Sequence, residues 1–228
     1  MRILLLACLS SSLLATAAST SFAGLVISTP RGLNPGDHFR IVFVTTGTTD
    51  ATSKNISTYD AFVNTDANGA TYNGSVISWQ AIASTASVDA INHIGTTGDA
   101  VYRADGTKVT SSDDSSGLWS GSLLHAPNDY LSGTSATGAT VFTGTTAFGH
   151  SSFELGNLGD VTIGISNNNA SDWVSHYYDV PTASHNLYGI SSDLVVPGAT
   201  AVPEPSTAVL AGLGALAGLA YSFARNRK

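Results

Sequence analysis

The stretch FRIVFVTT, residues 39–46, decides how the body of this chain folds. Apolar and β-branched side chains fill it with little interruption, which is typical of a buried strand. Asn34-Pro35-Gly36-Asp37 stands just before it, and this composition is typical of a turn. We therefore expect a turn that leads into a buried strand.

A helix is expected soon after this strand. Ser57-Thr58-Tyr59-Asp60 is a variant of the capping box, and apolar residues recur at helical spacing from Ile56 to Val63. Gly69 is expected to end the helix, because glycine readily adopts the backbone conformation that follows a last helical turn.

Short runs of strand-forming residues follow, and Ala104-Asp105-Gly106 predicts a hairpin turn between two of them. The expected strands are residues 76–83, 100–103, 107–109, 139–145, 161–165 and 187–190. One early helix and many short, mostly antiparallel strands with long loops indicate an α+β fold, with an all-β sandwich as the alternative.

The order of these local sequences resembles the C-type-lectin-like fold in its endostatin-like branch, in which calcium is optional. The resemblance rests on FRIVFVT, STYDAFV, WQAIAST, VYRADGTKV, LWSGSLLHAPN, VFTGT and LYGIS, with Trp173 before the last. Two features depart from it: residues 24–201 lack cysteine, and Ala126-Pro127-Asn128-Asp129 only faintly echoes the calcium and sugar motifs of true lectins. The resemblance implies a fold, whereas sugar binding requires a site of its own.

The N-terminal residues are expected to be a signal peptide. Arg2 supplies a positive charge, residues 3–18 are apolar or small, and Ser21-Phe22-Ala23 fits the cleavage rule, with Ala17 as the second choice of cleavage site. The single cysteine, Cys8, would leave with this peptide. An exported domain without disulfides must then rely on its hydrophobic core.

The C-terminal residues predict a membrane anchor. Residues 207–224 carry no charge, and the basic residues Arg225, Arg227 and Lys228 follow at once. At about 1.5 Å per residue such a helix spans about 27 Å, close to the hydrocarbon thickness of about 30 Å. The basic end should stay in the cytoplasm and the body outside. A buried core helix is the alternative.

A proline–acid–proline triplet, Pro203-Glu204-Pro205, precedes this span, and its fixed φ angles keep it extended. The triplet, the small-residue span and the Arg-rich end with Arg225 and Arg227 resemble the PEP-CTERM sorting signal. The resemblance implies processing by an exosortase, a membrane protease or transpeptidase of Gram-negative bacteria that make exopolysaccharide. The protein would be anchored in the inner membrane before processing and would then reach the cell surface or extracellular matrix.

The expected layout is therefore a signal peptide at 1–23, an extracytoplasmic domain at 24–201 and a sorting signal at 202–228. Residues 24–201 carry 15 acidic and five basic side chains, a net charge near −10. Nucleic acid is excluded as a partner, because phosphate binding needs a basic face. No cofactor is expected other than Ca²⁺, for which Asp113 and Asp114 in the polar loop at 111–117 are the candidates. An exposed, solubilising loop is the alternative.

Catalytic motifs are missing from the sequence, which contains no HExxH, GxSxG, GxxxxGK[ST] or GxGxxG pattern. The six histidines are expected to be single polar residues in loops. A small ligand cluster of His176 with Asp172 and Asp179 is the alternative. Four aromatic residues in polar surroundings are candidates for binding a sugar by stacking: Trp119, Trp173, Tyr177 and Tyr178. Trp79, in an apolar strand, is expected in the core.

These observations favour a noncatalytic protein of the cell surface or biofilm matrix that binds exopolysaccharide. A secreted hydrolase acting on polysaccharide or peptide is the first alternative, because paired carboxylates cannot be recognised from sequence. A purely structural matrix component without a specific ligand is the second.

Overall fold

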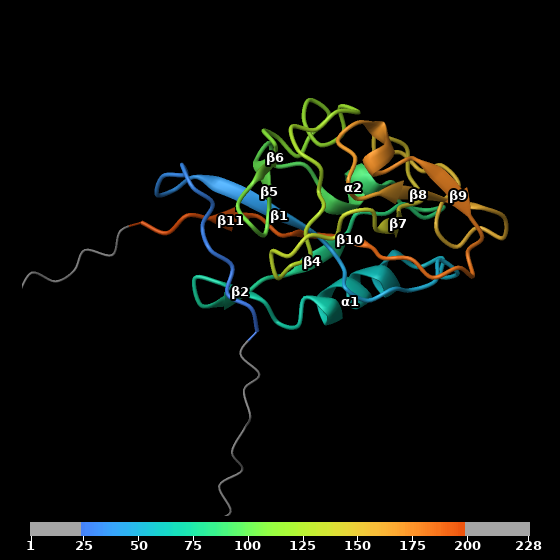
Figure 1. Cartoon of the computed structure of the whole chain (residues 1–228), viewed down its shortest axis with the longest axis horizontal. Coiled ribbons are helices and arrows are strands. Elements are labelled where there is room, and N and C mark those ends of the chain that lie inside the picture. Colours follow the sequence, from blue (N-terminus) through green and yellow to red (C-terminus); the bar gives the residue numbers. More distant parts are fainter. Residues whose placement is uncertain (1–23, 199–228) are drawn as a thin grey trace, which may run out of the picture.

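The computed structural model of the chain describes residues 24–198 (Figure 1). The signal peptide expected at 1–23, the sorting signal and the membrane helix expected at 207–224 lie outside these residues. Within residues 24–198, no helix is long and apolar enough to cross a membrane. The described part is rich in short strands and has few helices.

The larger sheet has six strands, with the seven-residue β1 at its centre. Five strands lie side by side in the order β4 (Trp79–Ala81), β10 (Tyr188–Ser191), β1 (His38–Val44), β5 (Ala100–Arg103), β6 (Lys108–Thr110). The sixth, β11 (Leu194–Val195), also pairs with β1. Only the β1–β5 pairing is parallel. The predicted buried strand and the predicted hairpin are confirmed, since Gly106 lies in the β5–β6 turn at φ +87°.

Strand β1 is buried on both faces, which explains its nearly continuous apolar sequence. Phe39, Ile41 and Phe43 enter one core cluster, whereas Val42 and Val44 enter another on the opposite face. The larger sheet is therefore the middle layer of the domain.

Helix α1 (Ile56–Asp66) covers the first face and α2 (Ala90–Ile94) the second (Figure 1). The predicted early helix is confirmed, but it begins earlier than the capping-box pattern indicates, because Asn55 caps it by accepting a hydrogen bond from the Ser57 N–H. Gly189 of β10 lets α1 approach closely. A Cβ atom there would lie 2.5 Å from Val63 Cγ1 of the helix.

A second, antiparallel sheet follows the order β7-β8-β9, with bounds β7 (Thr140–Phe142), β8 (Val161–Ile165) and β9 (Tyr177–Asp179). The short 3-10 helix η1 (Ser171–Trp173) precedes β9, and a two-stranded hairpin of β2 (Thr71–Tyr72) and β3 (Ser75–Val76) follows α1. The strand expected at 76–83 is divided between β3 and β4.

Strands with few helices fit the expected α+β class and also its all-β alternative. The lectin-like topology stays a prediction. Strand β9 lies at one end of the domain and β11 at the other (Figure 1). These two ends carry the features described next.

Candidate functional site

Two of the predicted sugar-binding aromatics are core residues. Trp119 and Trp173 are 1% and 0% exposed, and their ring centroids lie 6.1 Å apart in the second core cluster. The prediction that they lie at the surface is therefore wrong. Their polar sequence neighbours belong to loops, whereas the rings themselves point inward. Trp79 is buried as expected.

The other two predicted aromatics, Tyr177 and Tyr178, lie on β9 and are 65% and 54% exposed. Because successive strand residues point to opposite faces, the two rings cannot form one flat surface. Tyr177 packs edge-on against His176, with ring centroids 4.6 Å apart. Tyr178 instead packs against Phe153, with centroids 4.5 Å apart.

Phe153 is the partner that sequence reasoning missed. It is 47% exposed, and its φ of +45° is unusual for a residue other than glycine. Its segment is tied to β8, since the Thr162 N–H donates to Phe153 O at 2.9 Å and Thr162 Oγ1 donates to Ser152 O. A strained backbone that presents an exposed ring points to a functional surface.

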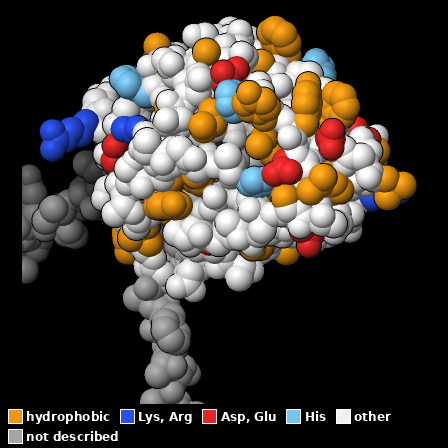
Figure 2. All heavy atoms as spheres, turned by 45° about the vertical axis from the view of Figure 1, so that its right-hand side comes forward, with side chains coloured by type: hydrophobic (Ala, Val, Ile, Leu, Met, Phe, Trp, Pro, Cys, Tyr) orange, Lys and Arg blue, Asp and Glu red, His pale blue; other side chains and the backbone are white. Residues whose placement is uncertain are grey.

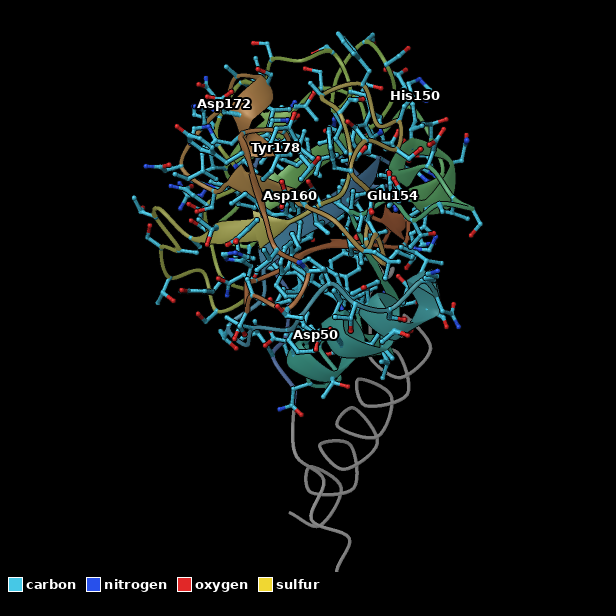
Figure 3. All side chains as sticks on the ribbon, turned by 90° about the vertical axis from the view of Figure 1, so that its right-hand side faces the viewer. Asp50, His150, Glu154, Asp160, Asp172 and Tyr178 are labelled. Carbon is cyan, nitrogen blue, oxygen red and sulfur yellow. The ribbon has the colours of Figure 1, made fainter. Side chains whose placement is uncertain are left out.

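Acidic and apolar residues adjoin this pair along the chain and the β8–β9 pairing: Glu154 follows Phe153, Val180 follows β9, and Asp160 precedes β8. We use the name aromatic–acidic face for Phe153, Leu158, Tyr178 and Val180 together with Glu154 and Asp160. The four apolar or aromatic members are all exposed. Figure 3 shows Tyr178, Glu154 and Asp160 on this side of the domain. Figure 2 shows hydrophobic and acidic side chains interspersed there.

The two aspartates predicted to bind Ca²⁺, Asp113 and Asp114, have different surroundings in the structure. Asp113 is fully buried, and Arg40 Nη1 donates to its Oδ2 at 3.0 Å. Asp114 is half-buried and accepts a hydrogen bond from Ser116 Oγ at 2.6 Å, which lowers the pKa of Asp114. The prediction that Asp113 and Asp114 bind Ca²⁺ together is wrong, because one of them already neutralises a buried guanidinium.

Most histidines are paired rather than isolated, contrary to expectation. Five of the six contact an aspartate carboxylate: His38–Asp193, His93–Asp60, His150–Asp89, His176–Asp172 and His185–Asp179. The alternative, a cluster of His176 with Asp172 and Asp179, is also wrong. His176 contacts Asp172 at 3.2 Å, whereas Asp179 lies 2.7 Å from His185 and is not part of that cluster.

His185 also contacts a hydroxyl group. Its Nδ1 lies 2.7 Å from Thr140 Oγ1, while its Nε2 lies 2.7 Å from Asp179 Oδ2. The hydrogen bond between His185 and Asp179 lowers the pKa of Asp179. The hydroxyl–imidazole–carboxylate order is the one that nucleophilic hydrolases use.

Another histidine belongs to a three-residue cluster. His38, Asp99 and Asp193 each offer one ligand atom, and these atoms lie within 4.8 Å of one another. The contact between His38 Nδ1 and Asp193 Oδ2, at 2.7 Å, raises the pKa of His38. Sequence reasoning missed this cluster because its members are distant in the chain and fit no short motif.

The loop at 126–129, which faintly resembles lectin motifs, contacts the side chain of Arg103. Arg103 Nη1 donates to Asn128 Oδ1, and Arg103 Nε lies 3.5 Å from Asp129 Oδ2. Asp129 Oδ2 is buried without a hydrogen-bond partner. Burial raises the pKa of Asp129 to about 6.

Comparison with protein families finds a match to the PEP-CTERM protein-sorting motif over residues 201–228. The chain carries a PEP-CTERM signal. This range contains Pro203-Glu204-Pro205, Arg225 and Arg227, so the predicted sorting signal is confirmed. None of the curated proteins matches the chain.

The PEP-CTERM motif supports an exported protein that an exosortase processes, with a membrane-associated stage and a cell-surface destination. In sequence, the motif follows soon after β11. Strand β9, which carries Tyr178 of the aromatic–acidic face, lies at the end of the domain opposite to β11, from which the chain continues toward the motif (Figure 1).

Proposed function

We propose that this PEP-CTERM protein is a noncatalytic component of the cell surface or biofilm matrix that binds exopolysaccharide through the aromatic–acidic face. The observation that carries the proposal is the exposed Phe153–Tyr178 pair, presented by a backbone at φ +45°. Exposed apolar groups gathered next to polar ones are typical of binding surfaces.

The chemistry of this face suits a sugar polymer. Aromatic rings offer apolar area against the C–H faces of sugar rings, and the hydroxyl group of Tyr178 can exchange hydrogen bonds with the ligand. The carboxylates of Glu154 and Asp160 can accept hydrogen bonds from sugar hydroxyls. Because residues 24–201 carry a net charge near −10, we expect a neutral polysaccharide rather than an acidic one.

The position of the face also suits a protein that is anchored before processing. We propose that residues 207–224 hold the chain in the inner membrane while residues 24–201 fold outside. The aromatic–acidic face, at the end of the domain opposite β11, would then point away from the membrane and toward the polymer.

The test is co-sedimentation of the full chain, purified in detergent, with the exopolysaccharide of the producing cell and with a neutral and an acidic polysaccharide. The proposal predicts binding to the native and neutral polymers, weaker binding to the acidic one, and the same binding in calcium and in EDTA. Failure to bind any polymer would contradict the proposal and leave a purely structural role or a hydrolase.

A second candidate function is hydrolysis of extracellular polysaccharide or peptide, and it rests on the Thr140–His185–Asp179 arrangement. Thr140 Oγ1 would be the nucleophile and His185 the base, oriented by Asp179. The test is hydrolysis of both substrate classes by the full chain and by Thr140→Ala and Thr140→Ser. Activity that alanine abolishes and serine preserves would establish this function in place of a noncatalytic one.

A further inference from the structure

The topology of the larger sheet brings three potential metal ligands together at one edge. His38 begins β1, Asp99 precedes β5 by one residue, and Asp193 lies between β10 and β11. Because β1 and β5 are parallel, their first residues meet at the same edge. Strand β10 runs antiparallel to β1, so its last residues meet there too.

A buried ion pair fixes the segment that carries Asp99. The carboxylate of Asp113 accepts hydrogen bonds from the backbone N–H groups of Thr97, at 2.9 Å, and Gly98, at 2.8 Å. The Asp99 N–H in turn donates to Thr97 Oγ1. These bonds restrict the position of the Asp99 backbone beside the sheet.

The other member of that ion pair is linked to the segments that carry the remaining two ligands. Arg40 Nε donates to Ser191 O at 2.8 Å, two residues before Asp193. Arg40 also follows His38 by two residues on β1, so the two side chains start from the same face of the strand. The buried Arg40–Asp113 pair thus connects all three ligand-bearing segments.

We propose that His38, Asp99 and Asp193 form a binding site for a divalent transition-metal ion of the Zn²⁺ type. One imidazole nitrogen and two carboxylate oxygens are ligands that Zn²⁺ accepts, and a fourth position would be open to water. Ca²⁺ and Mg²⁺ fit less well because they take oxygen ligands only. The side chains of His38 and Asp193 are 47% and 34% exposed, so an ion can enter from solvent.

The chain supplies an internal control for this site. His176 and Asp172 form an exposed His–carboxylate contact at 3.2 Å that resembles the His38–Asp193 contact. Among residues 24–198, however, this pair is not part of a cluster of three ligands. A metal ion that requires three protein ligands should therefore bind at His38–Asp193 and not at His176–Asp172.

The experiment is calorimetric titration of ZnCl₂ into the untagged full chain after removal of metal by a chelator. The proposal predicts one saturable Zn²⁺ site per chain. Asp99→Asn or His38→Gln should weaken Zn²⁺ binding by at least ~10-fold, because the loss of a group that only supports a metal ligand already weakens binding by about this factor. Asp172→Asn should leave binding unchanged. Co²⁺ should give visible absorption in the parent chain and not in Asp99→Asn.

The absence of saturable Zn²⁺ binding would overturn the proposal. Equal binding by the parent chain, Asp99→Asn and His38→Gln would overturn it as well. Circular dichroism of each variant verifies the fold, and using two ligand variants keeps the test valid if one of them unfolds. The result does not depend on polysaccharide binding, because the cluster lies on the larger sheet and the aromatic–acidic face lies on the smaller one.

Discussion

Arg40 Nη1 and Asp113 Oδ2 lie 3.0 Å apart, and the two side chains are 1% and 0% exposed. Arg40 lies within β1, where every residue after His38 is buried and an unpaired charge would be very unfavourable. The guanidinium also donates to the carbonyls of Ser191 and Gly95. A completed network of this kind fixes one arrangement of the surrounding loops.

Asp113→Asn should therefore destabilise the protein strongly. It leaves the Arg40 guanidinium buried without its counter-charge, which typically costs about 3–5 kcal/mol. Urea unfolding measures the change in the free energy of unfolding. Asp172→Asn removes an exposed ion-pair partner and should cost at most ~1 kcal/mol. Similar losses for the two variants would contradict the importance of the buried pair.

The close approach of α1 to the sheet gives a second prediction. In Gly189→Ala the new Cβ would lie 2.4 Å from Phe43 Cε1 and 2.5 Å from Val63 Cγ1, so the helix must shift. Overpacking of this kind costs about 1–3 kcal/mol, measured as a lower thermal unfolding temperature. Gly159→Ala, where the nearest atom is 3.8 Å away, should have little effect. Equal effects would show that α1 does not pack as described.

The raised pKa of Asp129 predicts that the contribution of this residue to the stability of the protein falls as the pH rises. Burial raises its pKa from 3.8 to about 6, with Arg103 and Asp105 as the neighbouring charges. Between these pH values the folded state binds more protons than the unfolded state, so the contribution of Asp129 to stability falls as pH rises. Asp129→Asn stays neutral throughout. Relative to the parent, Asp129→Asn should gain roughly 2–3 kcal/mol in the free energy of unfolding as the pH rises from about 4 to about 7.

Urea titrations of both proteins at several pH values measure this difference. The exposed Asp160→Asn is the control for the loss of one carboxylate at the surface. A constant difference between Asp129→Asn and the parent across the range would show that Asp129 ionises normally.

The sorting signal gives a prediction in the producing cell. Glu204→Ala removes the acidic residue between Pro203 and Pro205, which we expect the exosortase to recognise. The variant should accumulate uncleaved in the inner-membrane fraction, as measured by fractionation and immunoblotting. Glu154→Ala changes the chain's other glutamate and should be sorted like the parent. Normal release of the Glu204→Ala protein would contradict recognition of this triplet.

Features that depend on local sequence could be predicted. Residues 39–46 gave a buried strand, and the pattern from Ile56 to Val63 gave a helix, because burial periodicity reflects the local backbone. Asp105-Gly106 gave a hairpin for the same reason. The triplet at 203–205 could be recognised because sorting signals are contiguous.

Features that depend on the packing of distant segments could not be predicted. His38 and Asp193 are 155 positions apart and meet only because β10 returns beside β1. Trp119 and Trp173 lie in polar sequence but fill a core that the loops enclose. The exposed ring of Phe153 depends on a positive φ angle, which sequence does not reveal for a residue other than glycine.

The most direct test of the proposed function compares polysaccharide binding by Tyr178→Ala and Tyr177→Ala in the full chain. Both variants remove an exposed tyrosine from β9, but only Tyr178 belongs to the aromatic–acidic face. We predict that Tyr178→Ala weakens binding about tenfold, or ~1.4 kcal/mol, and that Tyr177→Ala binds like the parent. Equal binding by both variants and the parent would contradict a binding site built on the Phe153–Tyr178 pair.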